Sequence, residues 1–421
     1  MRIAIVGAGW AGLAAAVRAV TNGHQVNLLE MASAVGGRAR TVDQHGERFD
    51  NGQHILIGAY QQTLALMGQL GVDPDSVLCR LPLGLIQPDG RGLALSGSST
   101  PLRFFSAVLR HQEWTWASRA ALLRCSVAWA LRGFTCSEGL TVESLTRAMP
   151  PQVRRELTDP LCVAALNTPA AHASAQVFLR VLKDTLLGGR GSADLLIPRQ
   201  PLGDLLPQPA VKWLEAQGAQ VRLRCRAGAL KRLPSGWDLD GQAFDHVVLA
   251  CAASEAARLA QAHCPEWSER ARSLTHESIT TIYLTCPGAR FRAPMVLLPQ
   301  GPAQFAFDHG LIEHHPGRFA FVISAADEHR SLGRDGLSQA VINQALTQFP
   351  AGTWPKVPEV TAQFTEQRAT FRCEPGAMRP SASICAGLWA AGDYVQGPYP
   401  ATLEGAVRSG LSVIDHIDHL A

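Results

Sequence analysis

The sequence predicts an α/β fold made of two interleaved domains. Three observations indicate it: an apolar strand runs into a Gly-x-Gly-x-x-Gly turn at residues 7–12, strand patterns return at 192–255, and a second glycine-rich segment occupies 391–406. The first and last segments look like two halves of one site. We therefore expect a Rossmann-like nucleotide-binding domain, interleaved with a substrate domain of mixed sheet and helices.

The N-terminal turn joins the first strand to a helix of small residues. In this arrangement the backbone N–H groups at the start of the helix face a pyrophosphate. We expect Gly7 to allow the tight turn, Gly9 to keep a side chain out of the phosphate's path and Gly12 to let the helix pack closely. Trp10 and Ala11 lie between the last two glycines and are expected to contact the same ligand.

The second strand, residues 25–29, ends in Glu30, eighteen residues past Gly12. An acid at this place accepts hydrogen bonds from an unphosphorylated ribose, which favours FAD over an NADP-type ligand. Gly37 and Arg38 follow in a Gly-Gly-Arg pattern typical of the flavoprotein superfamily that contains amine oxidases and carotenoid desaturases. That resemblance implies that Arg38 offers a charged fork to the diphosphate.

The C-terminal half of the site contains Gly392 and Asp393, and Asp393 suits the ribityl or pyrophosphate region. A helix is predicted to begin at 402–406, with its positive end toward the N1/O2 edge of the isoalloxazine. The further expected FAD contacts are Ala227, Gln53, His54, Ala401, Thr402 and Leu403. Because no His or Cys lies in a recognisable attachment motif, we expect FAD to be bound without a covalent link.

Composition excludes several classes of protein. A net charge of +3 gives no electrostatic case for nucleic acid. Ten cysteines show no C-x-x-C spacing, so we expect reduced thiols and no metal site. We identify no signal peptide, and no run of 18 or more uncharged apolar residues, so we expect a cytoplasmic enzyme without a membrane-spanning segment.

We expect five segments along the chain. Residues 1–95, 191–255 and 367–421 form the FAD-binding domain, residues 96–190 a helical substrate part, and residues 256–366 a substrate-domain sheet. Strands are predicted at 218–223, 245–250, 280–285, 295–298, 304–307 and 319–324.

With these segments in view, the chain resembles the hydroxysqualene dehydroxylases, a squalene-associated subgroup of the amine oxidase and phytoene desaturase superfamily. The flavin motifs are shared across the superfamily, whereas the internal segments are more selective. The resemblance rests on residues 50–60, 165–169, 173–174, 178–180, 187–190, 194–199, 367–371, 379–380, 392–394 and 399–406.

The resemblance implies reductive removal of the hydroxyl of hydroxysqualene to give squalene, with reduced FAD as hydride donor. It also implies squalene-synthase-like enzymes as the source of the substrate. Three alternatives stay open: a carotenoid-type desaturase, which uses the flavin in the oxidative direction; an amine oxidase; and a non-catalytic flavin-binding partner. Thr402, where amine oxidases carry an aromatic residue, and the scarcity of lysines count against amine chemistry.

The proton donor to the departing hydroxyl is not visible in the pattern. His54 is the candidate catalytic residue, although a structural hydrogen bond explains it equally well; Tyr60 and Asp308 are weaker candidates. Tryptophans at 114, 116 and 129, with arginines between them, suit either a peripheral contact with the inner face of the membrane or an ordinary core.

Overall fold

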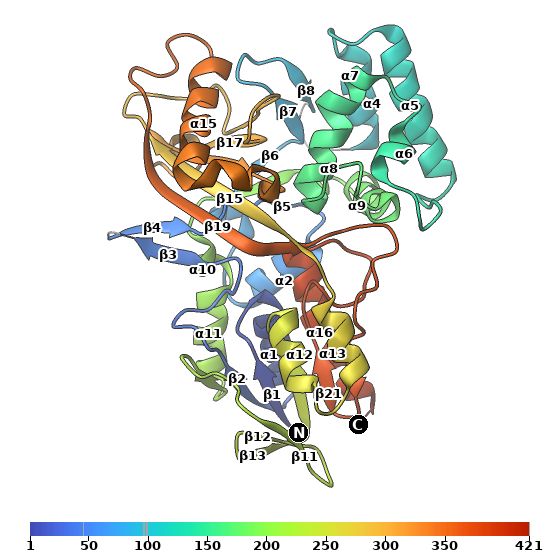
Figure 1. Ribbon diagram of the computed structural model, residues 1–421, viewed down its shortest axis with the longest axis vertical. Helices are drawn as coiled ribbons and strands as arrows, with labels where there is room; N and C mark the ends of the chain where they lie inside the picture. Colours follow the sequence, from blue (N-terminus) through green and yellow to red (C-terminus); the bar gives the residue numbers. More distant parts are fainter. Residues whose placement is uncertain (45, 96, 98–99, 421) are drawn as a thin grey trace.

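The computed structural model describes residues 1–44, 46–95, 97 and 100–420. It has two lobes (Figure 1), and both termini lie in the lower one. The lower lobe contains the large parallel sheet, and the upper lobe contains an antiparallel sheet beside a group of helices. The predicted α/β class with interleaved domains agrees with this arrangement, because the chain enters the lower lobe at its start, in its middle and at its end.

The lower sheet has six strands in the order β10-β2-β1-β14-β21-β20. Only β20 is antiparallel to its neighbour. Successive side chains of a strand point to opposite faces. Ile3 and Ile5 therefore pack on the side of α1, α11 and α16, while Ala4 and Val6 pack on the side of α12 and α13. The bounds are β1 (Arg2–Val6), β2 (Gln25–Leu29), β10 (Gln220–Arg222), β14 (His246–Leu249), β20 (Ser383–Cys385), β21 (Leu388–Ala390), α1 (Trp10–Thr21), α11 (Pro207–Ala216), α12 (Ala253–Ala260), α13 (Pro265–Arg272) and α16 (Leu403–Leu420).

The upper sheet has five antiparallel strands in the order β16-β17-β18-β15-β19. Helix α15 covers one face, and the other face joins the core shared with the helical layer. Figure 1 shows the two long strands β15 and β19 running together from the upper lobe toward the lower one. The bounds are β15 (His276–Thr285), β16 (Met295–Leu297), β17 (Phe305–Asp308), β18 (Arg318–Ile323), β19 (Glu359–Phe371) and α15 (Gly333–Gln348).

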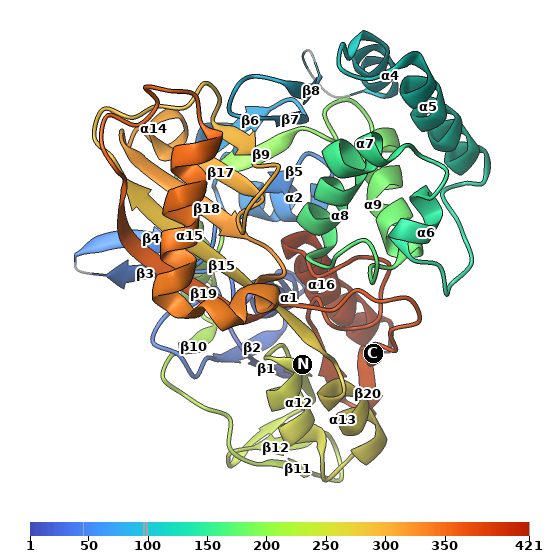
Figure 2. The ribbon, with the colours of Figure 1, turned by 45° about the horizontal axis from the view of Figure 1, so that its top comes forward.

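The helical layer occupies the upper right of Figures 1 and 2, and Figure 2 shows α4 and α5 at its outer edge. Four of its helices begin after a Ser or Thr whose side chain accepts a hydrogen bond from an N–H three residues later; these caps are Thr100, Thr115, Thr141 and Ser174. The bounds are α4 (Pro101–Arg110), α5 (Trp116–Leu131), α6 (Val142–Thr146), α7 (Pro151–Val153), the π-helical turn η1 (Arg154–Thr158), α8 (Asp159–Leu166) and α9 (Ala175–Leu187).

Five of the six strands predicted between residues 218 and 324 lie within two residues of observed ones, and the sixth, at 280–285, is the C-terminal part of β15, which begins at His276. The five-segment division itself stays a prediction, and strand β19 crosses its boundary between residues 366 and 367. No helix in the described ranges combines the length and hydrophobicity needed to cross a bilayer. The remaining elements are β3 (Thr41–Gln44), β4 (Glu47–Asp50), β5 (Leu56–Ile57), α2 (Gln61–Gln69), α3 (Pro74–Val77), β6 (Leu78–Leu81), β7 (Gly84–Ile86), β8 (Gly92–Ala94), β9 (Leu195–Pro198), α10 (Leu202–Leu205), β11 (Leu230–Arg232), β12 (Trp237–Leu239), β13 (Gln242–Phe244), α14 (His309–Ile312) and η2 (Ala326–Leu332).

Candidate active site

A cavity of about 610 Å³ lies where the two lobes meet. One part of its wall comes from the β1–α1 turn, residues 36–39, residues 51–55 and the C-terminal segment 392–406. The other part comes from the helical layer and from strands β16 to β18. The cavity therefore joins the predicted cofactor segments to the predicted substrate domain.

The three glycines of the first turn meet different spatial demands. A Cβ at Gly12 would lie 1.9 Å from the carbonyl oxygen of Gly7, and a Cβ at Gly7 would lie 2.6 Å from the carbonyl oxygen of Ala250. A Cβ at Gly9 would meet only Gly37, at 3.9 Å. Gly12 is thus required by close packing and Gly7, at φ +108°, by the tight turn, as predicted for each, whereas the space beside Gly9 is open toward the cavity.

The polar groups around this turn fit a dinucleotide. Helix α1 begins without a side-chain cap, so its first N–H groups are available to a phosphate. Glu30 is buried, and its carboxylate accepts hydrogen bonds from the N–H groups of Ala8 (2.7 Å) and Ala32 (2.8 Å), which fixes it on the cavity wall. The hydroxyl of Tyr394 is buried on the same wall with no hydrogen-bond partner among the described residues. A bound ligand would satisfy it.

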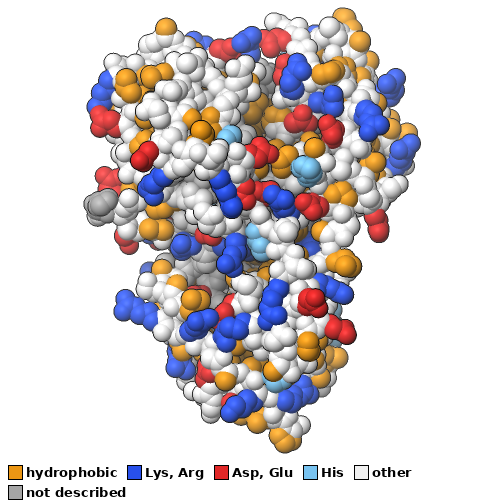
Figure 3. Space-filling view, viewed as in Figure 1, with side chains coloured by type: hydrophobic (Ala, Val, Ile, Leu, Met, Phe, Trp, Pro, Cys, Tyr) orange, Lys and Arg blue, Asp and Glu red, His pale blue; other side chains and the backbone are white. Residues whose placement is uncertain are grey.

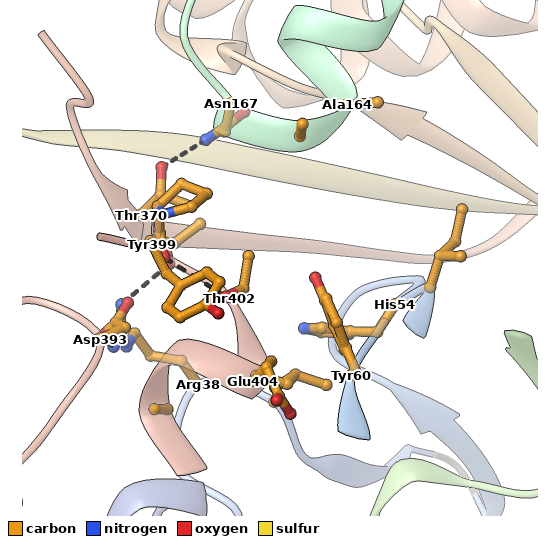
Figure 4. A pocket seen from close by; sticks show the side chains of 18 of the residues that line it. Arg38, His54, Tyr60, Ala164, Asn167, Thr370, Asp393, Tyr399, Thr402 and Glu404 are labelled. Carbon is orange, nitrogen blue, oxygen red and sulfur yellow. Dashed lines mark hydrogen bonds and ion pairs between the residues drawn. The ribbon is translucent and has the colours of Figure 1, made fainter. Parts of the chain in front are cut away.

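Arg38 joins the two ends of the chain. Its guanidinium forms an ion pair with Asp393 and donates to the carbonyl oxygen of Ala369 at 3.0 Å. Figure 4 shows this pair on one side of the pocket and Tyr60 on the other, with Thr402 between them. One arm of the predicted fork is therefore engaged by Asp393, and the contact of Arg38 with a diphosphate remains a proposal.

The N-terminus of α16 points into the cavity. Thr402 caps it, because its Oγ1 accepts a hydrogen bond from the N–H of Gly405 at 3.0 Å. The buried carboxylate of Glu404 accepts from Arg408 (2.7 Å) and from the backbone N–H of Thr63 (2.9 Å) at the start of α2. The sequence did not single out Glu404, although it lines the cavity and ties α16 to α2.

The structure brings the predicted cofactor residues together, although it does not test their contact with FAD. All but one line the cavity; Gly12 is the exception, since it packs behind the turn. The residues on the wall are Gly7, Gly9, Trp10, Ala11, Glu30, Gly37, Arg38, Gln53, His54, Ala227, Gly392, Asp393, Ala401, Thr402 and Leu403.

His54 lines the cavity, and its ring is held by the backbone of its own loop. Its Nδ1 lies 2.7 Å from the carbonyl oxygen of Gly52, so the ring proton of the neutral tautomer is held there and Nε2 is an acceptor. Burial and the nearby charge of Arg38 lower the pKa of His54 below its usual 6.5. To act as an acid, His54 must first take up a proton. Asp308, one of the two weaker candidates, lies outside the cavity, where its carboxylate accepts from the N–H groups of Phe291 and Gly310.

A second polar cluster, not found from the sequence, lies on the wall of the helical layer. Arg180 donates to the hydroxyl of Tyr399 (3.0 Å) and to the carboxylate of Asp184 (3.0 Å), while Arg408 lies over the Tyr399 ring at 5.3 Å. Tyr399 and Asp184 both line the cavity. Burial and the charge of Asp184 raise the pKa of Tyr399, so the phenol keeps its proton at neutral pH. Tyr399 lies in the segment 399–406, but Arg180 and Asp184 come from α9, far away in sequence.

The part of the cavity lined by the helical layer and by strands β16 to β18, called the chamber below, is mostly apolar, although Ser126, Thr158, Asn167, Thr185 and Ser324 also line it. No cavity-lining residue in the described part of the chain is a lysine. Among the side chains that face the chamber are Leu83, Phe104, Leu122, Trp129, Phe134, Leu157, Phe178, Leu182, Met295, Phe305 and Phe307.

The model of the family described as flavin containing amine oxidoreductase matches residues 10–417 of the chain. The chain belongs to this family. A flavin containing amine oxidoreductase is an FAD-dependent oxidoreductase, and FAD is its cofactor. We call the predicted FAD-binding residues on the cavity wall the cofactor cradle.

Within the flavin containing amine oxidoreductases, the chain is similar to curated proteins of two activities. It is 27% identical to the hydroxysqualene dehydroxylase of Sinorhizobium fredii, covering 98% of this chain and 97% of that protein. The hydroxysqualene dehydroxylase of Zymomonas mobilis is also 27% identical, with the same coverage. A probable zeta-carotene desaturase of Synechococcus elongatus is 24% identical, covering 97% of each chain.

The fold is also found in solved structures of oxidoreductases. A structure of an oxidoreductase from Methanosarcina mazei has a TM-score of 0.75 at 15% identity, covering 99% of this chain and 100% of that one. At this identity the likeness supports the fold alone.

Proposed function

We propose that this enzyme removes the hydroxyl of hydroxysqualene reductively to give squalene. The observation that carries the proposal is the continuity of the cofactor cradle with a mostly apolar chamber, in which Arg180, Asp184 and Tyr399 form a charged cluster on the helical side. A long hydrocarbon with a single hydroxyl needs such a chamber and one polar place in its wall. The names of the full-length relatives support the same substrate.

The chain's own residues would favour this chemistry in two ways. Bound in its reduced form, FAD supplies the hydride. Loss of an allylic hydroxyl leaves a delocalised cation that water would capture, and a wall of side chains such as Phe104, Leu122 and Phe305 excludes water. The departing oxygen also requires a proton, which the apolar wall cannot provide.

Tyr399 and His54 are the groups on the wall that we compare as partners of the departing oxygen; Tyr60, a weaker candidate from the sequence, also lines the cavity. Tyr399 holds its proton on Oη at neutral pH. After transfer, the guanidinium of Arg180 would stabilise the phenolate, while burial and the charge of Asp184 oppose it. His54, our candidate from the sequence, holds its proton on Nδ1 against Gly52. We therefore extend the proposal to Tyr399 as donor, with His54 as an acceptor of a hydrogen bond that orients substrate or cofactor.

A carotenoid-type desaturase is the second candidate, because a probable zeta-carotene desaturase matches 97% of the chain and a mostly apolar chamber suits such a substrate equally. Under either proposal the enzyme acts in the cytoplasm, including the inner face of the membrane. Squalene-synthase-like enzymes would supply the substrate of the dehydroxylase.

Anaerobic substrate addition separates the two candidates. The photoreduced holoenzyme is mixed with hydroxysqualene while flavin absorbance is followed and the lipid products are extracted. The proposal expects reoxidation of the flavin with one squalene formed for each flavin oxidised. Bleaching of the oxidised enzyme by phytoene or squalene, with new double bonds in the product, would instead establish a desaturase.

A further inference from the structure

Helix α5 has two faces of opposite character. Leu122, Ser126 and Trp129 point to the cavity. On the opposite stripe, at helical spacing, lie Trp116 (71% exposed) and Leu131 (84% exposed). A single helix therefore separates the chamber from the surroundings of the molecule.

Helix α4 continues the exposed apolar surface. Leu102 is 82% exposed, and Leu109 follows seven residues later on the same side, while Phe104 and Val108 are buried on the other. Figure 2 places α4 and α5 at the outer edge of the molecule, where the described elements leave their outer side uncovered. Large apolar side chains gathered on one outer face are unusual for a protein surrounded only by water.

The same two helices concentrate positive charge. Residues 100–136 contain five arginines and one glutamate, a net charge of +4, whereas the whole chain carries +3. In Figure 3, Lys and Arg side chains lie beside hydrophobic ones at the upper right, where Figure 1 places α5. The arginines are Arg103, Arg110, Arg119, Arg124 and Arg132.

We infer that this face, formed by Leu102, Leu109, Trp116, Val127 and Leu131 with the arginines between them, docks on an anionic lipid surface. Apolar side chains enter the acyl boundary, while the long stems of the exposed Arg110, Arg124 and Arg132 keep their guanidinium groups at the phosphates. Arg119 is held instead by the carbonyl oxygens of Leu109 and Trp114. The charge favours a membrane over a second copy of this chain, because two such faces, each with +4, repel one another. A membrane-facing role of Trp114 and Trp129 is wrong, because both are buried. Only Trp116 lies outside.

The inference indicates how a lipid substrate would pass from the membrane to the chamber. The proposed substrate is a lipid, and the helices that would touch the membrane also form the chamber wall through Phe104, Leu122 and Trp129. The route rests on the proposed function, whereas the docking face does not. The two are therefore tested separately.

Vesicle sedimentation of the FAD-loaded protein tests the docking face. We compare vesicles of phosphatidylcholine alone with vesicles containing phosphatidylglycerol, at low and high salt. The test variant is Trp116→Ser/Leu131→Ser, and the matched control is Met378→Ser/Leu420→Ser, whose side chains are exposed to 74% and 70% away from this face. All four positions lie outside the cavity wall.

Wild type and control should bind the anionic vesicles, and more weakly as salt rises. The test variant should need on the order of tenfold more lipid for half-binding. Its flavin content, and its turnover of hydroxysqualene dispersed in detergent, should match wild type. Equal lipid binding by test and control variants would overturn the inference, as would a concentration-dependent dimer that only the test variant loses. If wild type and both variants show the expected differences in lipid binding but none of them turns over hydroxysqualene, the proposed function alone is contradicted.

Discussion

The guanidinium of Arg38 forms an ion pair with the carboxylate of Asp393, a residue 355 positions later in the chain. The pair fastens the segment after β2 to the segment after β21 at the place where both reach the cavity. The carboxylate is buried and the guanidinium is partly exposed, so the two partners are not equivalent when removed.

The first prediction separates two tasks of Arg38. Arg38→Gln leaves a buried carboxylate unpaired and should lower the melting temperature of the apoprotein more than Asp393→Asn. If Arg38 also contacts the diphosphate, Arg38→Gln should still weaken FAD binding by about tenfold in the Asp393→Asn background. Flavin fluorescence titration measures the affinity. Unchanged affinity in that background would limit Arg38 to holding Asp393.

The second prediction compares two glycines of one turn. Gly9→Val should leave the melting temperature of the apoprotein nearly unchanged but abolish FAD retention, because the new side chain meets little protein and enters the open space of the cavity. Gly12→Val should prevent folding, since its Cβ would overlap the carbonyl oxygen of Gly7. Absorbance of the purified proteins at flavin wavelengths provides the measurement. Yellow Gly9→Val protein would contradict a phosphate at this turn.

The third prediction concerns Tyr399. Tyr399→Phe keeps the ring over which Arg408 lies but removes the proton on Oη. Flavin content should stay at the wild-type level, while single-turnover reoxidation by hydroxysqualene should slow on the order of 100-fold. Wild-type rates in Tyr399→Phe would exclude this hydroxyl from proton transfer.

The fourth prediction uses pH to distinguish His54 from Tyr399. The pKa of His54 lies below 6.5, so a step that needs protonated His54 accelerates as pH falls through that region. With Tyr399 as donor, the single-turnover rate should stay flat between pH 6 and 8. His54→Gln should then retain much of the activity, because an amide can replace a hydrogen bond but not an acid. His54→Ala should lose more, and a slope that His54→Gln removes would return the role to His54.

The fifth prediction concerns Asp50, which directly precedes the cavity-lining residues 51–55. Burial raises its pKa to about 7, although it accepts hydrogen bonds from Thr41 and from the N–H of Leu202. The folded protein holds this proton more tightly than the unfolded chain, so the stabilisation is present at acid pH and is lost as pH rises toward 7. Asp50→Asn should remove this decline. Melting curves from pH 5 to 8 should show a difference between the proteins on the order of a few degrees.

Local patterns carried enough information to predict the cofactor half of the site. A turn such as Gly7–Gly12 has its geometry built into neighbouring residues, and Glu30 follows at a spacing that one strand and one helix dictate. The cluster of Arg180, Asp184 and Tyr399, in contrast, could not be predicted from the sequence. Two of its members lie on a helix whose orientation is set by the packing of the whole helical layer, and no spacing rule relates them to the third.

The state of His54 illustrates the same limit. Its residue type and its place in the loop marked it as an acid, but its protonation depends on a carbonyl two residues away and on the burial of the folded cavity. In the same way, the three tryptophans of the helical layer look alike in sequence. Only the packed helices show that Trp116 alone faces outward.

The strand order of the lower sheet has a consequence during synthesis on the ribosome. Strand β14 pairs with β1 on one side and with β21 on the other, so the sheet begun by the first residues stays incomplete until residues 388–390 emerge. Helix α16, which packs on α1, emerges later still. The nascent chain therefore cannot close its flavin cradle during elongation. A transcript truncated even shortly before Asp393 yields a polypeptide that contains most of the chamber wall but lacks Asp393 and the N-terminus of α16, which form one side of the cofactor cradle.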